Sequence, residues 1–345
     1  MRILHLIESL GGGVLTSVLA MVEATPELEH HVAVWPRRSH ADTGDRLDAF
    51  DGVHELRSRL PRALRSADDL IRDLGPHQVH AHSSYAGLLA RVLRPTVDVA
   101  YSPHCFAFER QDVGPAARAG VRRIERALAA RTAALVACSP REAALARGLG
   151  HRRVVTVPNR PLDVPDLRAR FASELRVVTV GRIGPQKDWS YLLRTKGYLE
   201  DVLGAHVDWE WLGGGDPGAE QALRAHGVSV AGWLPRAEVL VRLSRAHVYV
   251  HTAAWEGAPI SILEAASLGL PLAVRGIPGL LSLEVPGVAR TAADLAYRIV
   301  RLRDPGLWSA EQQRSLHFAA GHTRRLQHER LTAAYGLAAP DLVLR

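Results

Sequence analysis

The sequence predicts two α/β domains, each built on a doubly wound parallel sheet, that face each other across a cleft. Short β-rich runs alternate with helical stretches along the 345 residues, a pattern typical of parallel α/β units. Most runs are continuous in Val, Ile and Ala, as in strands covered by helices on both faces. Three prolines within residues 158–165 interrupt the alternation and indicate a linker. Because such sheets bind ligands beyond the carboxyl ends of their strands, we expect an active site in the cleft.

Both halves contain predicted strands with helical stretches between them. The expected strands are Arg2–Ile7, His31–Trp35, Gln78–His82, Val97–Ser102, Ala134–Ser139 and Val154–Val157, then Arg176–Val180, Val207–Leu212, Val228–Trp233, His247–Thr252 and Pro271–Val274. The expected helices include Pro61–Leu74, Ala116–Arg131, Pro140–Leu149, Arg236–Ser244 and Ala258–Leu268.

The composition is that of an ordinary globular protein. Hydrophobic residues make up 47% of the chain and charged residues 23%, which argues against a disordered protein. Two cysteines, Cys105 and Cys138, are too few for a disulfide framework and favour a reducing compartment. The first apolar run ends at Glu8, too short for a signal peptide, and no run reaches the ~18 apolar residues of a membrane-spanning helix. We therefore expect a cytoplasmic globular protein.

The net charge of +7 suggests nucleic-acid binding. However, only two of the 43 basic residues, Lys187 and Lys196, are lysines. This imbalance indicates a coding bias towards arginine, and no RNA-reading aromatic pattern or zinc-finger spacing accompanies it. We expect no nucleic-acid partner. Where arginine is the habitual cation, a lysine is a candidate for a site that needs a compact ammonium group.

Glycines follow the first predicted strand, in Glu8-Ser9-Leu10-Gly11-Gly12-Gly13. They let the backbone approach a ligand closely, and the helix expected after them attracts anions at its N-terminus. A plain connection between strand and helix would give the same pattern. The spacing is not the G-x-G-x-x-G of dinucleotide enzymes, which argues against a nicotinamide-linked oxidoreductase.

Two cations follow the first strand of the second half, in Gly181-Arg182-Ile183-Gly184-Pro185-Gln186-Lys187-Asp188. Across such a turn Arg182 and Lys187 can converge on one anion. A diphosphate suits them, because a guanidinium grips two oxygens while an ammonium neutralises a third. The alternative is a pair of solvated loop cations; the rarity of lysine in this chain favours the anion site.

Two carboxylates frame the helix predicted near Pro259, in Glu256-Gly257-Ala258-Pro259-Ile260-Ser261-Ile262-Leu263-Glu264-Ala265. Amides of a first helical turn donate to phosphate or sugar oxygens, and carboxylates accept hydrogen bonds from sugar hydroxyls. The alternative is that Glu256 complements the helix dipole and that Glu264 is a solvated surface acid. The apolar neighbours of Glu264 indicate instead that its helix is mostly buried.

Three histidines lie on or after neighbouring strands of the first half. His80 and His82 share one face of a strand, and His104 ends the next strand, where it reaches the expected cleft. No carboxylate or cysteine completes a metal-ligand set around them, so we expect no metal. For His80 we prefer a hydrogen-bonded structural role.

Residues 109–153 hold ten arginines against four acidic residues. Ala116, Val121, Ile124 and Leu128 recur on alternate turns and predict a basic amphipathic helix. Such a helix in 110–153 would contact an anionic membrane surface at the inner face or an acidic acceptor. A solvated arginine-rich face is the equal alternative.

Together these segments resemble the large family of retaining sugar-nucleotide glycosyltransferases (family 4) with the two-domain GT-B fold, in which both domains are Rossmann-like. The resemblance runs from the Glu8–Gly13 segment through Val79-His80-Ala81-His82, Ser102-Pro103-His104, Val157-Pro158-Asn159 and Gly232-Trp233-Leu234-Pro235. Its most specific part is the E-G-x-P-x-x-x-L-E-A frame at residues 256–265, in register with the cations of the 181–187 turn.

The resemblance implies a catalytic group of His104, Arg182, Lys187 and Glu256. Arg182 and Lys187 would hold the donor diphosphate, with help from amides near Gly12 and Gly13. Glu256 would bind donor-sugar hydroxyls, and His104 would lie beside the sugar and the attacking hydroxyl. The remaining donor-binding residues would be Trp233 and Leu234 at the base, Gly257, Ala258, Pro259 and Ile260 at sugar and phosphate, and Glu264 at the ribose.

The implied reaction moves a hexose-type sugar from a nucleotide diphosphate sugar, most readily a UDP-sugar, to a hydroxyl acceptor on a glycan, lipid-linked carrier or natural product. It would retain the anomeric configuration and require neither metal nor cofactor. Residues 1–160 would form the acceptor-binding domain, 161–322 the nucleotide-sugar domain, and 323–345 a helix returning to the first domain.

Two positions depart from the family pattern. Cys105 follows His104 where glycine is commoner, and Arg160 follows Pro158-Asn159 where glycine is common. Two alternatives also remain: a sugar-nucleotide epimerase of the same architecture, and a non-enzymatic basic binding module.

Overall fold

The computed structural model describes residues 1–8, 11–36, 46–93, 96–337. The predicted positions Ser9 and Leu10, and residues 338–345 of the predicted C-terminal segment, lie outside them. The chain forms two compact units, Asp163–His322 and a second made of Met1–Leu162 with the chain from Thr323 onward. Each unit is described by itself below.

The first unit is built on a seven-stranded sheet of parallel strands in the order β3-β2-β1-β4-β5-β6-β7. The strands are β1 (Arg2–Ile7), β2 (Glu29–Val34), β3 (Gly52–Glu55), β4 (Gln78–His82), β5 (Asp98–Ser102), β6 (Ala134–Ala137) and β7 (Val154–Thr156). β1 and β4 lie in the middle and are almost wholly buried, including the histidines that they carry.

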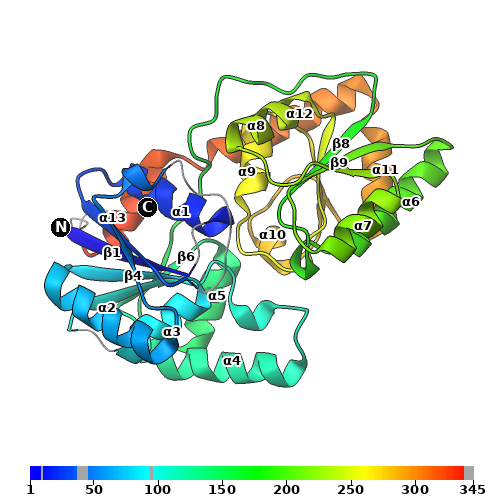
Figure 1. The fold of residues 1–345 in the computed structure, drawn as a ribbon. Coiled ribbons are helices and arrows are strands. Elements are labelled where there is room, and N and C mark those ends of the chain that lie inside the picture. The colour runs from blue at the N-terminus through cyan, green and yellow to red at the C-terminus, as the bar shows by residue number, and fades with distance from the viewer. Residues whose placement is uncertain (9–10, 37–45, 94–95, 338–345) are drawn as a thin grey trace. The chain divides into compact units, whose positions relative to one another are not determined.

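Helices cover both faces of this sheet (Figure 1). They are α1 (Gly12–Ala24), α2 (Leu60–Leu74), α3 (Ser83–Leu93), α4 (Pro115–Leu128), α5 (Pro140–Leu149) and α13 (Arg324–Ala334). Alternate β1 side chains divide between the faces. Leu4 and Leu6 pack with α2, α3 and α5, whereas Ile3 and Ile7 face α1 and α13.

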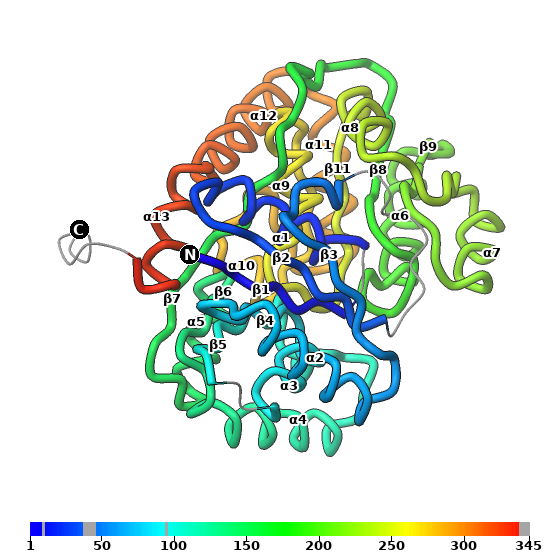
Figure 2. The backbone as a smooth tube through the Cα atoms, turned by 60° about the vertical axis from the view of Figure 1, so that its left-hand side comes forward, coloured from blue at the N-terminus to red at the C-terminus, as the bar shows by residue number. Residues whose placement is uncertain are grey.

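The last helix, α13, lies against the first sheet although it comes from the far end of the chain (Figure 2). Leu331 and Tyr335 pack with Ile3. The buried Arg160 guanidinium donates to Gln327 Oε1 at 3.0 Å and to Glu23 Oε2 at 2.8 Å. An arginine therefore replaces the glycine of the family pattern because it joins α1 to α13.

The second unit is built on a six-stranded parallel sheet in the order β10-β9-β8-β11-β12-β13. Its strands are β8 (Arg176–Val180), β9 (Asp208–Leu212), β10 (Val228–Val230), β11 (Val248–His251), β12 (Leu272–Arg275) and β13 (Val288–Ala289). Its core includes Trp209, Trp211 and Tyr249, each fully buried.

Two groups of helices cover the second sheet (Figure 1). α6 (Trp189–Leu203), α7 (Pro217–Ala225) and α11 (Ala292–Arg301) lie on one side, and α8 (Arg236–Arg245), α9 (Ile260–Ser267) and α12 (Pro305–Ala320) on the other. The short helix α10 (Pro278–Ser282) follows β12. Both units are thus doubly wound parallel α/β domains, as predicted.

The sequence-based prediction missed the edge strands β3 and β13. Only one apolar residue, Val53, lies in β3, and β13 is two residues long; neither produces a β-rich run. The helix predicted from Ala258 begins at Ile260, with Pro259 in extended backbone as its N-cap.

The apolar face predicted for α4 is wrong in part. Ile124 is half exposed, whereas Glu125 is buried and accepts a hydrogen bond from Arg91 at 2.9 Å and from the Tyr101 hydroxyl at 3.1 Å. α4 therefore faces the domain through Leu128 and a buried ion pair. Among the residues that the structure describes, no helix has the length and apolar character needed to cross a bilayer.

Candidate functional site

Predicted site residues of the second unit follow three strands at the carboxyl edge of its sheet. Lys187 follows β8, Trp233 follows β10 and Glu256 follows β11, and the glycines 213–215, which were not predicted as site residues, follow the intervening strand β9. Parallel strands deliver their carboxyl ends to one edge, and that edge is where α/β sheets bind ligands. Strand order thus gathers residues up to 69 positions apart in the sequence, Lys187 and Glu256, at one edge.

Gly181 makes room for the Lys187 side chain. It has φ +139°, and a Cβ at this position would lie 2.6 Å from Lys187 Cε. The turn is also held to the loop after β11, because Thr252 Oγ1 donates to the Lys187 carbonyl at 2.7 Å and Ala254 N donates to the Gln186 carbonyl at 2.9 Å. The backbone thus fixes Lys187 beside the Glu256 loop.

Lys187 and Glu256 form an ion pair. Lys187 Nζ donates to Glu256 Oε1 at 2.6 Å, with both side chains largely buried. The buried His251 ring lies 3.7 Å from the same carboxylate oxygen. Burial and then the Lys187 charge hold the pKa of His251 well below its usual value, so this imidazole is neutral and leaves the ion pair undisturbed.

Glu264 lies on α9 with its side chain buried, as its apolar neighbours predicted. Its Oε1 accepts a hydrogen bond from Arg236 Nε at 2.7 Å. Burial raises the pKa of Glu264, and the Arg236 charge opposes this rise. The guanidinium is also anchored, since Arg236 Nη1 donates to the Asp163 carbonyl at 3.0 Å.

Glycines bring the surrounding backbone close. A Cβ at Gly213 would lie 2.2 Å from the Gly181 carbonyl, and one at Gly279 would lie 2.2 Å from the Glu256 carbonyl. Gly279, at the start of α10, therefore supports the loop that carries Gly257 and Ala258, both buried, into α9. Pro259 and Ile260 form the start of that helix.

Trp233 and Leu234 differ in exposure. Trp233 is 52% exposed and its indole lies over Gly214, whereas Leu234 packs against the core. Arg182 is exposed in the turn that holds Lys187. The structure therefore joins Lys187 to Glu256 directly, while Arg182 and Trp233 offer exposed groups at the same edge.

Gly12 and Gly13 belong to the first unit and begin α1. Both are exposed, Gly12 has φ +66°, and no atom lies within 4 Å of a Cβ built at either one. Their backbone is accessible at the start of this helix, as an anion site of this kind requires.

His104 also belongs to the first unit and follows β5. Its φ is +51°, and that of Cys105 is +89°, so both lie in the left-handed region. Cys105 N donates to the buried Glu142 carboxylate at 2.7 Å, whose other oxygen accepts from Cys138 N at 2.8 Å. Glu142 thus holds the bend that presents His104, and the glycine common in the family would adopt the Cys105 conformation without strain.

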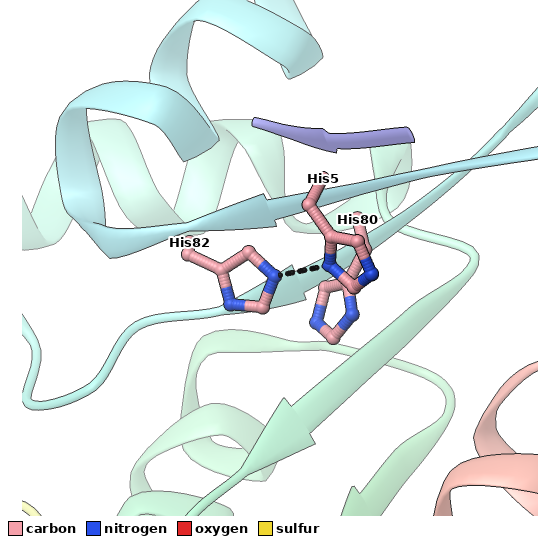
Figure 3. A group of neighbouring side chains, drawn as sticks. All are labelled: His5, His80 and His82. Carbon is pink, nitrogen blue, oxygen red and sulfur yellow. Dashed lines mark hydrogen bonds between the residues drawn. The ribbon is translucent and has the colours of Figure 1, made fainter. Parts of the chain in front are cut away.

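Among the described residues, one cluster has the spacing of metal ligands: His5, His80 and His82, whose ring nitrogens lie within 4.8 Å of one another (Figure 3). The donor set does not favour a metal. His80 bonds through both nitrogens, to the Tyr335 hydroxyl at 2.8 Å and to Ser102 Oγ at 2.9 Å. His5 and His82 bond each other at 3.0 Å. These nitrogens already have hydrogen-bonding partners.

The sequence-based prediction missed Arg236, His251 and His5. Arg236 is 28 positions from Glu264 and His251 ends a strand, so neither has a local spacing signal. His5 interrupts an otherwise apolar strand, and that single polar residue was the available signal.

Two family models match the chain. Residues 12–160 match a glycosyl transferase 4-like domain, and residues 174–304 match glycosyl transferases group 1. No curated protein sequence matches.

Solved structures share the fold at low sequence identity. A sucrose-phosphate synthase from Thermosynechococcus elongatus is 16% identical over 98% of this chain and 100% of its own, with a TM-score of 0.80. Anabaena HepE in complex with UDP and glucose is 14% identical over 96% and 98%, with a TM-score of 0.75. TarM of S. aureus, in complex with UDP and other ligands, is 9% identical over 97% and 99%, with a TM-score of 0.76.

Proposed function

Because the chain belongs to the glycosyltransferases of the GT-B fold, we propose that it transfers a hexose-type sugar from a UDP-sugar to a hydroxyl acceptor with retention of configuration. The observation that carries this proposal is the Lys187–Glu256 ion pair at 2.6 Å, at the carboxyl edge of the second sheet. Solved structures of the same fold with UDP or a UDP-sugar support the choice of donor.

Lys187 is the cation for the donor diphosphate. Its ammonium group is held by Glu256 and by the backbone of its turn, so little reorganisation is needed when charge develops on the leaving diphosphate. Arg182 adds a guanidinium from the same turn. The amides of Gly257 to Ile260, and those of Gly12 and Gly13, supply further donors to phosphate and sugar oxygens.

Glu256 has a second carboxylate oxygen for a donor-sugar hydroxyl, and Glu264 accepts from the ribose hydroxyls while Arg236 holds its Oε1. Trp233 and Leu234 contact the base through their backbone.

The reaction needs no pair of catalytic carboxylates of the glycosidase kind. In the retaining step the bond from the sugar to the diphosphate breaks, the acceptor oxygen bonds the same face, and the acceptor proton passes to the leaving diphosphate. This scheme requires no metal.

Thermal shift tests the donor site. The protein is melted with UDP, GDP, ADP and dTDP sugars, without and then with added divalent metal. A ligand that binds the folded state at 100 times its Kd adds about 2.7 kcal/mol to the free energy of unfolding. We expect a UDP-sugar to raise the midpoint without metal, and Lys187→Ala and Glu264→Ala each to abolish the rise.

Two variants serve as controls. Lys196→Ala removes the other lysine, which pairs with Glu200 on α6, and Glu238→Ala removes an exposed acid of α8. Both should keep the UDP-sugar response. A panel without any response contradicts the proposal. Retention is tested by NMR on the sugar that slow hydrolysis of the donor releases. If the anomer formed first is opposite to that of the donor, the proposed retention of configuration is overturned.

A further inference from the structure

Four histidines in the first unit form one unbroken row of hydrogen bonds. His104 Nε2 lies 3.0 Å from His82 Nδ1, and His82 Nε2 lies 3.0 Å from His5 Nδ1. His5 Nε2 lies 3.0 Å from His30 Nδ1, and His30 Nε2 lies 3.0 Å from the Thr25 carbonyl oxygen. We call this set, from Thr25 to His104, the histidine row.

The parallel sheet produces the row. His30, His5 and His82 lie on the adjacent strands β2, β1 and β4, and His104 follows β5, the next strand in the order. His5 pairs in register with His80, and paired residues of parallel strands point to the same face. His82, two residues further along β4, shares that face. The row therefore crosses the sheet from strand to strand; Figure 3 shows its central bond.

All four imidazoles are neutral. His5, His82 and His30 are at most 2% exposed. Burial, reinforced by neighbouring histidines, holds the pKa of His5 and His82 well below the usual value. Burial also lowers the pKa of His30, and lowers that of His104 to about 4. Each neutral ring therefore has one N–H donor and one acceptor nitrogen.

The Thr25 end fixes which nitrogen carries the proton. A carbonyl oxygen only accepts, so His30 Nε2 must donate and its Nδ1 must accept. Thr25 Oγ1, 3.1 Å from the same nitrogen, donates its own proton to the Met21 carbonyl and so accepts as well. It follows that His5 donates from Nε2 to His30, His82 donates from Nε2 to His5, and His104 donates from Nε2 to His82.

We infer that the histidine row holds His104 as the neutral Nε2–H tautomer and leaves its Nδ1 as a hydrogen-bond acceptor for a substrate hydroxyl. In the described part of the chain no group bonds His104 Nδ1, and the residue is partly exposed. The hydroxyl being that of a sugar or acceptor rests on the proposed function. His82, His5 and His30 are positioning residues: they act through His104.

A tautomer of this kind selects its partner. Nδ1 without a proton accepts from O–H or N–H groups and repels the acceptor oxygens of a phosphate. His104 would therefore orient a hydroxyl and would not bind the diphosphate. A zinc ion in the His5, His80 and His82 cluster would need the lone pairs on His5 Nδ1 and His82 Nδ1, which the row already uses. Zinc in stoichiometric amount in the purified protein therefore overturns the inference.

NMR of the full-length protein labelled with ¹⁵N-histidine tests the row directly. Long-range ¹H–¹⁵N spectra near neutral pH distinguish protonated from unprotonated ring nitrogens. We expect Nε2–H and a bare Nδ1 in His104, His82, His5 and His30. An Nδ1–H tautomer, a positive charge or a mixture at any of the four in the wild-type protein contradicts the inference.

Variants at position 5 break and restore the row. His5→Leu removes the acceptor of His82 Nε2–H, so the single tautomer of His82 and His104 should be lost to a mixture. His5→Asn keeps an acceptor oxygen where Nδ1 lies and should preserve it. His80→Leu is the matched control, because His80 is equally buried and neighbours His5 but lies outside the row; it should leave His104 unchanged. If His5→Leu does not fold, the wild-type and His5→Asn spectra still test whether His104 is held as the Nε2–H tautomer.

The tautomer of His104 and the proposed function are tested by separate measurements. The tautomer spectra need no ligand, so their result does not depend on whether the protein binds a UDP-sugar. Titration of the labelled protein with the UDP-sugar that gives a thermal shift should move the His104 Nδ1 resonance to lower frequency, as a new hydrogen bond does. A thermal shift without that change overturns a contact between His104 Nδ1 and a donor-sugar hydroxyl while leaving the donor site intact.

Discussion

Lys187 Nζ and Glu256 Oε1 lie 2.6 Å apart although 69 positions separate the two residues in the sequence. The pair exists because β8 and β11 are neighbours in the second sheet and each ends in a loop at the same edge. Gly181 is part of the arrangement, since the Lys187 side chain passes where its Cβ would be. The positions of Lys187, Glu256 and Gly181 thus depend on one another.

Gly181→Ala should therefore damage both stability and donor binding. The Cβ would lie 2.6 Å from Lys187 Cε at a φ of +139°, and such backbone strain costs roughly 1–3 kcal/mol. Urea unfolding should show this loss, and the proposed UDP-sugar response should weaken because Lys187 is displaced.

Gly184→Ala is the control from the same turn. Gly184 has an extended backbone and no atom within 4 Å of its built Cβ. The Gly184→Ala variant should have the same free energy of unfolding in urea as the wild type. Equal losses in the two variants would show that the turn, and not the Lys187 contact, is sensitive.

Replacement of Cys105 by glycine should stabilise the protein. Cys105 has φ +89°, where glycine avoids a strain of order 1 kcal/mol. Chemical denaturation should show a gain of about that size for Cys105→Gly and none for Cys105→Ala, which keeps the Cβ but loses the thiol. A gain in both variants would assign the effect to the thiol.

Loss of the carboxylate at position 125 should be among the most destabilising surface-helix changes. Glu125→Ala leaves the Arg91 guanidinium, whose side chain is 0% exposed, without its ion-pair partner, and an uncompensated buried charge costs roughly 3–5 kcal/mol. Glu238→Ala, which breaks a half-exposed pair on α8, should cost about 1 kcal/mol or less. Similar midpoints for the two variants would contradict the buried pair.

The buried histidines should make the protein less stable in acid. The pKa of His80 is lowered to about 3, and those of His5 and His82 also lie well below the value of about 6.5 in the unfolded chain. Below pH 6.5 the unfolded state binds more protons, so the free energy of unfolding falls as pH falls. Each such group contributes up to about 1.4 kcal/mol per pH unit.

The difference between wild type and His80→Leu isolates one of these groups. Buried carboxyls such as Glu142 and Glu264 have raised pKa values and oppose the trend at low pH. Both proteins contain these carboxyls, so their contributions cancel when the free energy of unfolding of His80→Leu is subtracted from that of the wild type. Denaturation from pH 7 to 5 should give a shallower pH dependence for His80→Leu, and parallel curves would show that His80 does not titrate on unfolding.

The central strands and the local spacing of the proposed donor-site residues were predictable from the sequence. β1, β4 and β8 have the predicted boundaries. For β1 and β8 the signal was a mostly apolar run of the kind that buried parallel strands have. The Glu256 to Glu264 spacing and the scarce Lys187 are likewise local signals. By contrast, β3 and β13 are short edge strands without a β-rich run. Glu125 of α4 is buried because Arg91 and Tyr101 donate hydrogen bonds to its carboxylate, and these partners are distant in the sequence.

The sequence by itself determined two doubly wound domains and the residue types that we propose for the donor site, since these depend on periodicity and local spacing. Only the tertiary structure decided which residues meet: Lys187 with Glu256, Glu264 with Arg236, and His5 between His30 and His82. Such contacts depend on strand order and register, which bring together side chains distant in the sequence, and no local pattern records that order.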